Sequence, residues 1–217
     1  MSDAEALAAL HRRIEVCTDC RLHGTRTRAV PGDGPVTARI MAVGEAPGES
    51  EDRTGHPFVG AAGQLLTRLL QSIGLAREDI FICNVLKCRP PGNRDPEPDE
   101  VSACAHHLDE QVRLIRPDAI LLLGRHAVGR LLPGMPGISR IHGQRVRRGE
   151  RLYVPLFHPA AALYNASLLR TLEEDMQRVR GYLEEAAAER EREQRERAEE
   201  AALATAVRAA DEQLTLF

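Results

Sequence analysis

The chain has 217 residues, of which 43% are hydrophobic and 28% charged, a composition typical of a folded globular protein rather than a disordered one. No apolar run approaches the roughly 20 residues that span a bilayer, and the first residues lack a basic-then-apolar signal pattern, so we expect a cytoplasmic protein without a membrane partner. The net charge of −3 is unevenly distributed, because residues 183–217 hold ten acids and five arginines while the rest carries 24 basic and 22 acidic side chains. A mildly basic body with an acidic tail is only weak support for a nucleic-acid partner.

Strand and helix patterns alternate along most of the chain. Apolar runs predict four strands, at 39–43, 79–86, 119–123 and 152–157. Helical periodicity appears at 3–16, 64–73, 97–115, 125–132 and 166–185. This alternation predicts an α/β protein with three layers, α/β/α, around a central, mostly parallel four-stranded sheet. Because each strand ends in polar or glycine-rich residues, we expect a single composite site at the carboxyl edge of the sheet.

The last part of the chain has a different composition. Residues 183–212 are charged on all sides, which predicts a solvated helix or a disordered linker. Residues 213–217, Gln-Leu-Thr-Leu-Phe, are apolar again. We therefore expect a folded domain at 1–182, a linker at 183–212 and a separate terminal peptide at 213–217.

The segment 44–63, GEAPGESEDRTGHPFVGAAG, follows the first predicted strand directly. Its five glycines let the backbone approach a ligand closely. Its four carboxylates lie where open α/β sheets place their ligands. The segment is therefore predicted to be an active-site loop.

Four of the five cysteines fall into two pairs. Cys17 and Cys20 form a C-x2-C pair, and Cys88 and Cys104 lie further along the chain. Such a set can hold zinc or an iron–sulfur cluster, and the spacing does not separate the two. The alternative is two unrelated pairs of buried thiols, although Cys17, Cys20 and Cys88 all stand beside basic or polar residues. Cys83 lies inside an apolar strand and is interpreted as a core residue.

Four motifs, GEAPG, GHPFVG, NVLKCRPPGNRDP (84–96) and FHPAA (157–161), closely resemble those of the family 4 uracil-DNA glycosylases, over about residues 10–182. The resemblance implies an α/β/α fold and a monofunctional enzyme that flips uracil out of double- or single-stranded DNA. Hydrolysis of the N-glycosidic bond would leave an abasic site and initiate base excision repair. The resemblance also assigns Cys17, Cys20, Cys88 and Cys104 to a structural 4Fe-4S cluster. We expect a monomer in the cytoplasm, associated with the nucleoid.

The same resemblance assigns roles to individual residues. Asn84 would read the uracil edge, because a carboxamide matches uracil N3–H and O4, whereas cytosine presents the reverse pattern. Phe58 would stack on the flipped base, and His158 would hydrogen-bond uracil O2. Leu163 would act as the wedge that fills the space left in the duplex. Taken singly, a turn asparagine, a core phenylalanine and a structural histidine are the ordinary alternatives.

The motifs leave three candidates for the group that positions the attacking water. Ala46, expected to contact uracil, stands where the best-known branch of the superfamily has an aspartate that assists water attack. Glu45, Glu51 or the backbone must then take this role. We favour Glu51, because Glu45 is expected to hold the loop through its side chain. The predicted catalytic residues are therefore Glu45, Glu51 and His158.

The terminal peptide suggests a second partner. Gln213, Leu214, Leu216 and Phe217 resemble the bacterial sliding-clamp-binding pentapeptide, with folding back onto the domain as the alternative. Two other functions are disfavoured. The branch that becomes covalently attached to uracil-containing DNA carries an inserted basic loop with a histidine, which residues 87–95 lack. A non-catalytic metal-binding DNA module would not need Asn84 and His158.

Overall fold

The computed structural model describes residues 1–214 of the chain, and the side chains of residues 1–199. It divides into two compact units, Met1–Val179 and Arg180–Phe217. The second unit contains the later turns of one long helix, α8 (Ala166–Leu214). Within the described residues, no helix is both long enough and apolar enough to cross a membrane.

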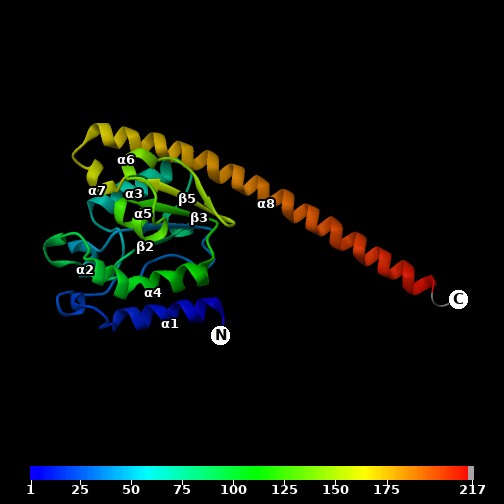
Figure 1. Ribbon diagram of the computed structural model, residues 1–217, viewed down its shortest axis with the longest axis horizontal. Helices are drawn as coiled ribbons and strands as arrows, with labels where there is room; N and C mark the ends of the chain where they lie inside the picture. The colour runs from blue at the N-terminus through cyan, green and yellow to red at the C-terminus, as the bar shows by residue number, and fades with distance from the viewer. Residues whose placement is uncertain (215–217) are drawn as a thin grey trace. The chain divides into compact units, whose positions relative to one another are not determined.

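A single five-stranded sheet forms the centre of the first unit (Figure 1). Its strands are β1 (Ile40–Gly44), β2 (Phe81–Asn84), β3 (Ala119–Leu123), β4 (Val146–Arg148) and β5 (Arg151–Leu156). They run in the order β2-β1-β3-β5-β4, with all pairs parallel except β4 and β5. The predicted mostly parallel α/β sheet is confirmed, with five strands in place of four. Strand β4 escaped prediction because three residues with two arginines show no apolar run.

Helices connect the strands and cover the sheet. They are α1 (Asp3–Glu15), α2 (Glu49–Thr54), α3 (Ala61–Ser72), α4 (Pro98–Ile115), α5 (Arg125–Leu131), α6 (Ile138–Ile141) and α7 (Pro159–Ala162). Short 3-10 turns lie at Arg21–Gly24, Arg77–Asp79 and Pro91–Asn93. Helix α2 lies inside the predicted loop, where its six mainly polar residues give no apolar periodicity.

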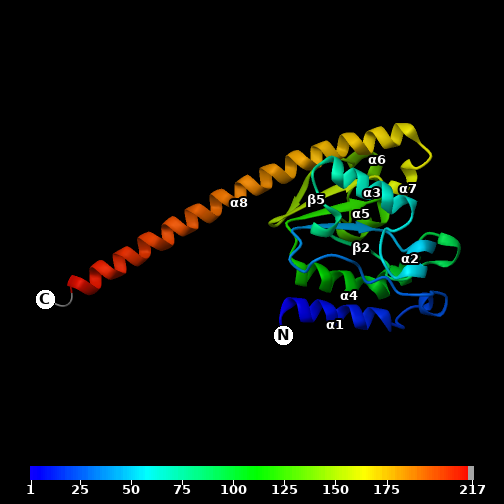
Figure 2. The ribbon, with the colours of Figure 1, turned by 180° about the vertical axis from the view of Figure 1, so that it is seen from behind.

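Alternation along the strands divides the core into two faces. Met41, Phe81 and Ile120 face the buried residues of α1 and α4, such as Leu10 and Leu108, in one continuous cluster. The intervening strand residues point to the opposite face. There α3 and the first turns of α8 cover the sheet, as Figures 1 and 2 show, and the leucines of α3 on this side are buried. The three layers are therefore α/β/α.

The strand order locates the ligand site. From β1 the chain continues to β2 on one side of the sheet, while β3 and β5 lie on the other side. The direction of winding thus reverses between β1 and β3, and the loops after these strands diverge to leave a crevice at their carboxyl ends. The polar strand ends noted in the sequence all lie at this edge.

Candidate active site

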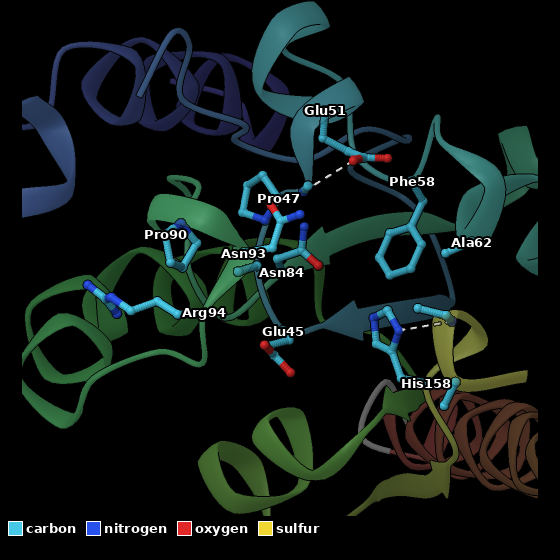
Figure 3. A pocket seen from close by; sticks show the side chains of 14 residues that line it. Glu45, Pro47, Glu51, Phe58, Ala62, Asn84, Pro90, Asn93, Arg94 and His158 are labelled. Carbon is cyan, nitrogen blue, oxygen red and sulfur yellow. Dashed lines mark hydrogen bonds between the residues drawn. The ribbon is translucent and has the colours of Figure 1, made fainter. Parts of the chain in front are cut away.

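A cavity of about 380 Å³ opens at the carboxyl edge of the sheet, a size suited to a small ligand. Residues from the ends of β1, β2 and β5 and from the loop around α2 line it (Figure 3). They are Glu45, Ala46, Pro47, Gly48, Glu51, Phe58, Ala62, Asn84, Pro90, Asn93, Arg94, His158, Ala160 and Ala161. The structure therefore brings together all of the predicted base-contacting and catalytic residues.

Asn84 ends β2 at the floor of this cavity and is 1% exposed. Its Oδ1 atom has no hydrogen-bond partner among the described residues. A buried unpaired amide oxygen costs about 1–3 kcal/mol, so a ligand that supplies an N–H donor regains that free energy on binding. The side chain fits only because its neighbour on β1 is Gly44, where a Cβ atom would lie 2.4 Å from Asn84 Oδ1 and 2.5 Å from Phe58 Cζ.

Phe58 forms one wall of the cavity and is 7% exposed. Its backbone has φ of +52°, a left-handed conformation that a bulky residue rarely adopts. Two contacts hold it there. Gly63 packs so closely that a Cβ would lie 1.8 Å from the Phe58 carbonyl oxygen, and the Arg77 guanidinium donates to the Pro57 carbonyl at 2.6 Å. Strain held in this way at a cavity wall indicates a functional constraint.

His158 follows β5 and caps α7. Its Nδ1 accepts the Ala160 backbone N–H at 3.2 Å, which leaves Nε2 to carry the ring proton (Figure 3). Burial lowers the pKa of His158 to about 4, so the ring is neutral at physiological pH. It stacks on Phe58 with ring centroids 5.7 Å apart. The site therefore offers a neutral imidazole N–H donor beside an aromatic surface.

The two candidate acids have different surroundings. Glu51 accepts three backbone N–H groups: Oε1 accepts those of Val59 and Gly60, both at 2.8 Å, and Oε2 accepts that of Gly48 at 3.1 Å. The expectation that Glu45 holds the loop is therefore wrong, because Glu51 does so. Glu45 has a half-buried carboxylate on the cavity wall, and burial raises its pKa. Sequence could not assign these bonds, because they depend on how the loop folds back across α2.

Ala46 lines the cavity between the two acids and brings no polar side chain to it. On the segment after His158, the predicted wedge Leu163 is half-buried. The next residue, Tyr164, is 97% exposed. Sequence reasoning passed over this tyrosine, although it is one of only three in the chain.

The four paired cysteines line a second, smaller pocket between α1, α4 and the segment after β2. Two N–H groups point at their sulfurs: the Arg26 guanidinium at Cys88 Sγ (3.1 Å) and the Lys87 backbone N–H at Cys104 Sγ (3.3 Å). Burial raises the pKa of Cys104 to about 11, so a metal would have to displace its proton. His107 Nε2 lies 3.3 Å from Cys17 Sγ, and the ligand atoms of Cys17, Asp19 and His107 all lie within 4.8 Å of one another.

Lys87 links this pocket to the cavity. It is 1% exposed, and its Nζ donates to the Asn84 backbone carbonyl at 2.8 Å and to Gln111 Oε1 at 2.7 Å. Gln111 in turn donates to the Pro31 carbonyl at 2.7 Å. Lys87 is the only lysine among the 29 lysine and arginine residues of the sequence, and this was the signal that could have singled it out.

Two comparisons with known proteins agree with this geometry. Residues 31–183 match the sequence profile of the family described as the Uracil DNA glycosylase superfamily. The fold and the site thus belong to a protein of this superfamily.

Relatives of this chain narrow the assignment. The chain is 46% identical to the "Type-4 uracil-DNA glycosylase" of Sulfurisphaera tokodaii, over 81% of this chain and 84% of that protein. It is 48% identical to the protein of that name from Archaeoglobus fulgidus (81% and 92% covered) and 44% identical to that from Thermotoga maritima (82% and 95% covered). Within the superfamily, the chain belongs to the type-4 uracil-DNA glycosylases.

Proposed function

We propose that this chain is a monofunctional uracil-DNA glycosylase, which hydrolyses the N-glycosidic bond of uracil in DNA and leaves an abasic site for base excision repair. The observation that carries the proposal is the unpaired Oδ1 of buried Asn84, which faces a cavity between an aromatic wall and a neutral imidazole. The names of the type-4 relatives support the same activity.

The residues of the cavity suit each step of that reaction. A uracil extruded from the duplex enters the cavity and stacks on Phe58, which contributes about 1–3 kcal/mol. Asn84 Oδ1 accepts uracil N3–H and its NH₂ donates to O4, so cytosine would leave these groups unpaired. As the glycosidic bond breaks, negative charge accumulates on uracil O2, where the His158 Nε2–H donates. A neutral imidazole is sufficient for this role, because its N–H stabilises the charge on O2 through a hydrogen bond without giving up the proton.

We assign the water-positioning role to Glu45. All of the Glu51 hydrogen bonds described above stabilise the loop, so that Glu51 acts by placing the backbone around Phe58. Glu45 presents its carboxylate to the cavity. It is the neighbour of Ala46, the residue that occupies the position of the catalytic aspartate in the best-known branch of the superfamily. An ionised carboxylate there can orient a water molecule and stabilise the cationic sugar.

The four cysteines fit the 4Fe-4S cluster that we propose for them. Four cysteines that line one pocket form a ligand set of the kind that holds a 4Fe-4S cluster, and the N–H groups aimed at Cys88 and Cys104 suit thiolate ligands. When bound, the cluster would stabilise the fold around these four cysteines and take no part in bond cleavage. Iron and sulfide analysis with absorbance near 400 nm tests the assignment against zinc.

A second partner is proposed at the end of the chain. Gln213, Leu214, Leu216 and Phe217 would bind a bacterial sliding clamp, although residues 215–217 lie outside the described residues. Deletion of 213–217 is expected to abolish clamp binding and to leave excision on free oligonucleotides intact. Equal clamp affinity of the two proteins would contradict this proposal. The monomeric state and the cytoplasmic, nucleoid-associated location stay predictions.

One assay tests the glycosylase proposal. Purified protein is incubated with oligonucleotides that hold uracil opposite guanine, opposite adenine or in a single strand, and alkali then cleaves abasic sites. We expect alkali-dependent cleavage for the wild type and, for Asn84→Ala, single-turnover rates lower by roughly 100-fold or more. No cleavage of any substrate would overturn the proposal. A product that remains attached to the protein in a denaturing gel would favour the covalent branch instead.

A further inference from the structure

Glu45 belongs to a small charged cluster that the sequence did not reveal. The ligand atoms of Glu45, Asp95 and His126 all lie within 4.8 Å of one another. They come from three separate segments: the end of β1, the segment before α4 and the first turn of α5. His126 Nε2 lies 3.7 Å from Glu45 Oε2 and 3.6 Å from Asp95 Oδ1, and both it and Glu45 are largely shielded, with side chains 21% and 30% exposed. The cluster therefore forms the outer support of the cavity wall.

His126 Nε2 faces a cation as well as two carboxylates. The Arg125 guanidinium donates to it at 3.2 Å and also pairs with Asp95. A neutral ring with an unprotonated Nε2 accepts from Arg125, whereas a protonated ring pairs with Glu45 and Asp95. The distances of 3.6–3.7 Å to the two carboxylates are too long for hydrogen bonds, and the contacts become ion pairs only when the ring carries a proton on both nitrogens.

We propose that His126 is a positioning residue that, backed by Asp95, holds the Glu45 carboxylate against the cavity for the attacking water. This inference rests on the proposed glycosylase function. It explains how a chain with alanine at position 46 can hold the Glu45 carboxylate at the cavity wall. The imidazole of His126 would fix the carboxylate from the side away from the cavity, so that no hydrogen bond from the backbone is needed.

The charges around Glu45 predict the pH dependence. Burial raises the pKa of Glu45, His126 lowers it, Asp95 raises it and Arg125 lowers it. Arg94 also lines the cavity, but its guanidinium is bonded to Glu100 at 2.9 Å. Glu45 can orient water only when ionised. Since an imidazolium favours the ionised carboxylate, removing His126 should move the acid limb of the rate profile to higher pH. Removing the Asp95 charge should move it the opposite way.

Single-turnover excision between pH 4.5 and 8 tests the proposal. We expect His126→Gln to lower the plateau rate roughly tenfold, less than the ~100- to 10,000-fold contribution of a positioned acid or base itself, because His126 acts through Glu45. We also expect it to shift the acid limb to higher pH. Asp95→Asn should shift it to lower pH. His126→Lys, which restores a fixed positive charge, should return the limb toward the wild-type position. His106→Gln is the matched control, since His106 lies 3.5 Å from Asp19 on an exposed part of α4.

The remaining outcomes distinguish a failure of the role proposed for His126 from a failure of the glycosylase function. If the wild type excises uracil and the His126→Gln profile superimposes on it, this inference fails and the glycosylase function stands. If the wild type does not excise uracil, the function fails first. Affinity for DNA with a preformed abasic site and thermal melting show whether His126→Gln is folded. An excision rate that depends on added Mg²⁺ would overturn the proposal, because the three groups would then be cation ligands.

Discussion

Gly44 and Asn84 end neighbouring strands so close together that a single added methyl group at Gly44 would collide with the Asn84 amide oxygen at 2.4 Å. The register of β1 and β2 pairs these two residues directly. The position of the Asn84 side chain in the cavity therefore depends on a glycine that is not among the residues lining the cavity.

Gly44→Ala is expected to lower uracil excision roughly 100-fold, because the new Cβ displaces both Asn84 and Phe58 from their positions. Overpacking should also cost about 1–3 kcal/mol of unfolding free energy. Single-turnover rates and denaturant unfolding measure the two effects. Gly129→Ala is the control, since a Cβ at this α5 residue meets nothing within 4 Å and should stabilise the helix by about 0.5–1 kcal/mol.

Glu45→Gln and Glu51→Gln should have different effects. Glutamine at 51 keeps one carbonyl acceptor where the carboxylate served three N–H groups, so stability should fall by about 1–3 kcal/mol and affinity for uracil-containing DNA should weaken. Glutamine at 45 should leave stability and binding near the wild type and reduce the single-turnover rate. A Glu51→Gln protein of normal stability with a collapsed rate would return the water-positioning role to Glu51.

The pKa of His158, lowered by burial to about 4, predicts a pH-dependent stability. Its unfolded pKa is near 6.5, so between pH 6.5 and 4 the unfolded chain binds the proton and the folded chain does not. The contribution of His158 is complete above pH 6.5 and is lost as the pH falls toward 4, by at most about 1.4 kcal/mol per pH unit. His158→Gln should flatten this part of the unfolding free energy curve. Parallel curves for the two proteins would show that the imidazole titrates normally.

Lys87→Met should weaken the preference for uracil-containing over undamaged DNA. The substitution leaves the Asn84 carbonyl and Gln111 Oε1 without their donor, which costs about 1–3 kcal/mol for each group. Lys87→Arg is the informative partner, since it keeps the charge but not the compact shape that a 1% exposed side chain requires. Competition binding measures the preference. Wild-type preference in both variants would mean that Asn84 is placed by the sheet alone.

The half-buried Leu163 is the predicted wedge, and the exposed Tyr164 next to it is a second candidate for contact with the duplex. We expect Leu163→Ala to slow excision from duplex DNA more than from a single strand, because only the duplex leaves a gap to fill. Tyr164→Ala should weaken affinity for duplex DNA at least as much as Leu163→Ala does, since Tyr164 is 97% exposed and its ring is free to stack on DNA. Equal losses on single-stranded and duplex substrates would argue against a wedge for either residue.

Much of the architecture could be predicted from the sequence, because strand and helix periods alternate clearly and the strand ends are polar. The position of His158 directly after a strand followed from the same pattern, whereas the predicted strand 79–86 extended two residues beyond Asn84, which ends β2 in the structure. The roles of Glu45 and Glu51 could not be predicted, since they depend on hydrogen bonds from Gly48, Val59 and Gly60 that form only when the loop closes. His126 and Asp95 are 31 residues apart and meet Glu45 only in the folded sheet.

The three hydrogen bonds that the Glu51 carboxylate accepts from backbone N–H groups fix the wall around Phe58 in the free protein. The conformational entropy of that loop is lost once, during folding, and not at every encounter with DNA. What differs between substrates is then the work of extruding the base, which is smallest for a single strand, larger at a G·U mismatch and largest for an A·U pair. With a rigid binding site of this kind, the order of excision rates among substrates is set by the DNA, through the free energy needed to extrude each base from its stack.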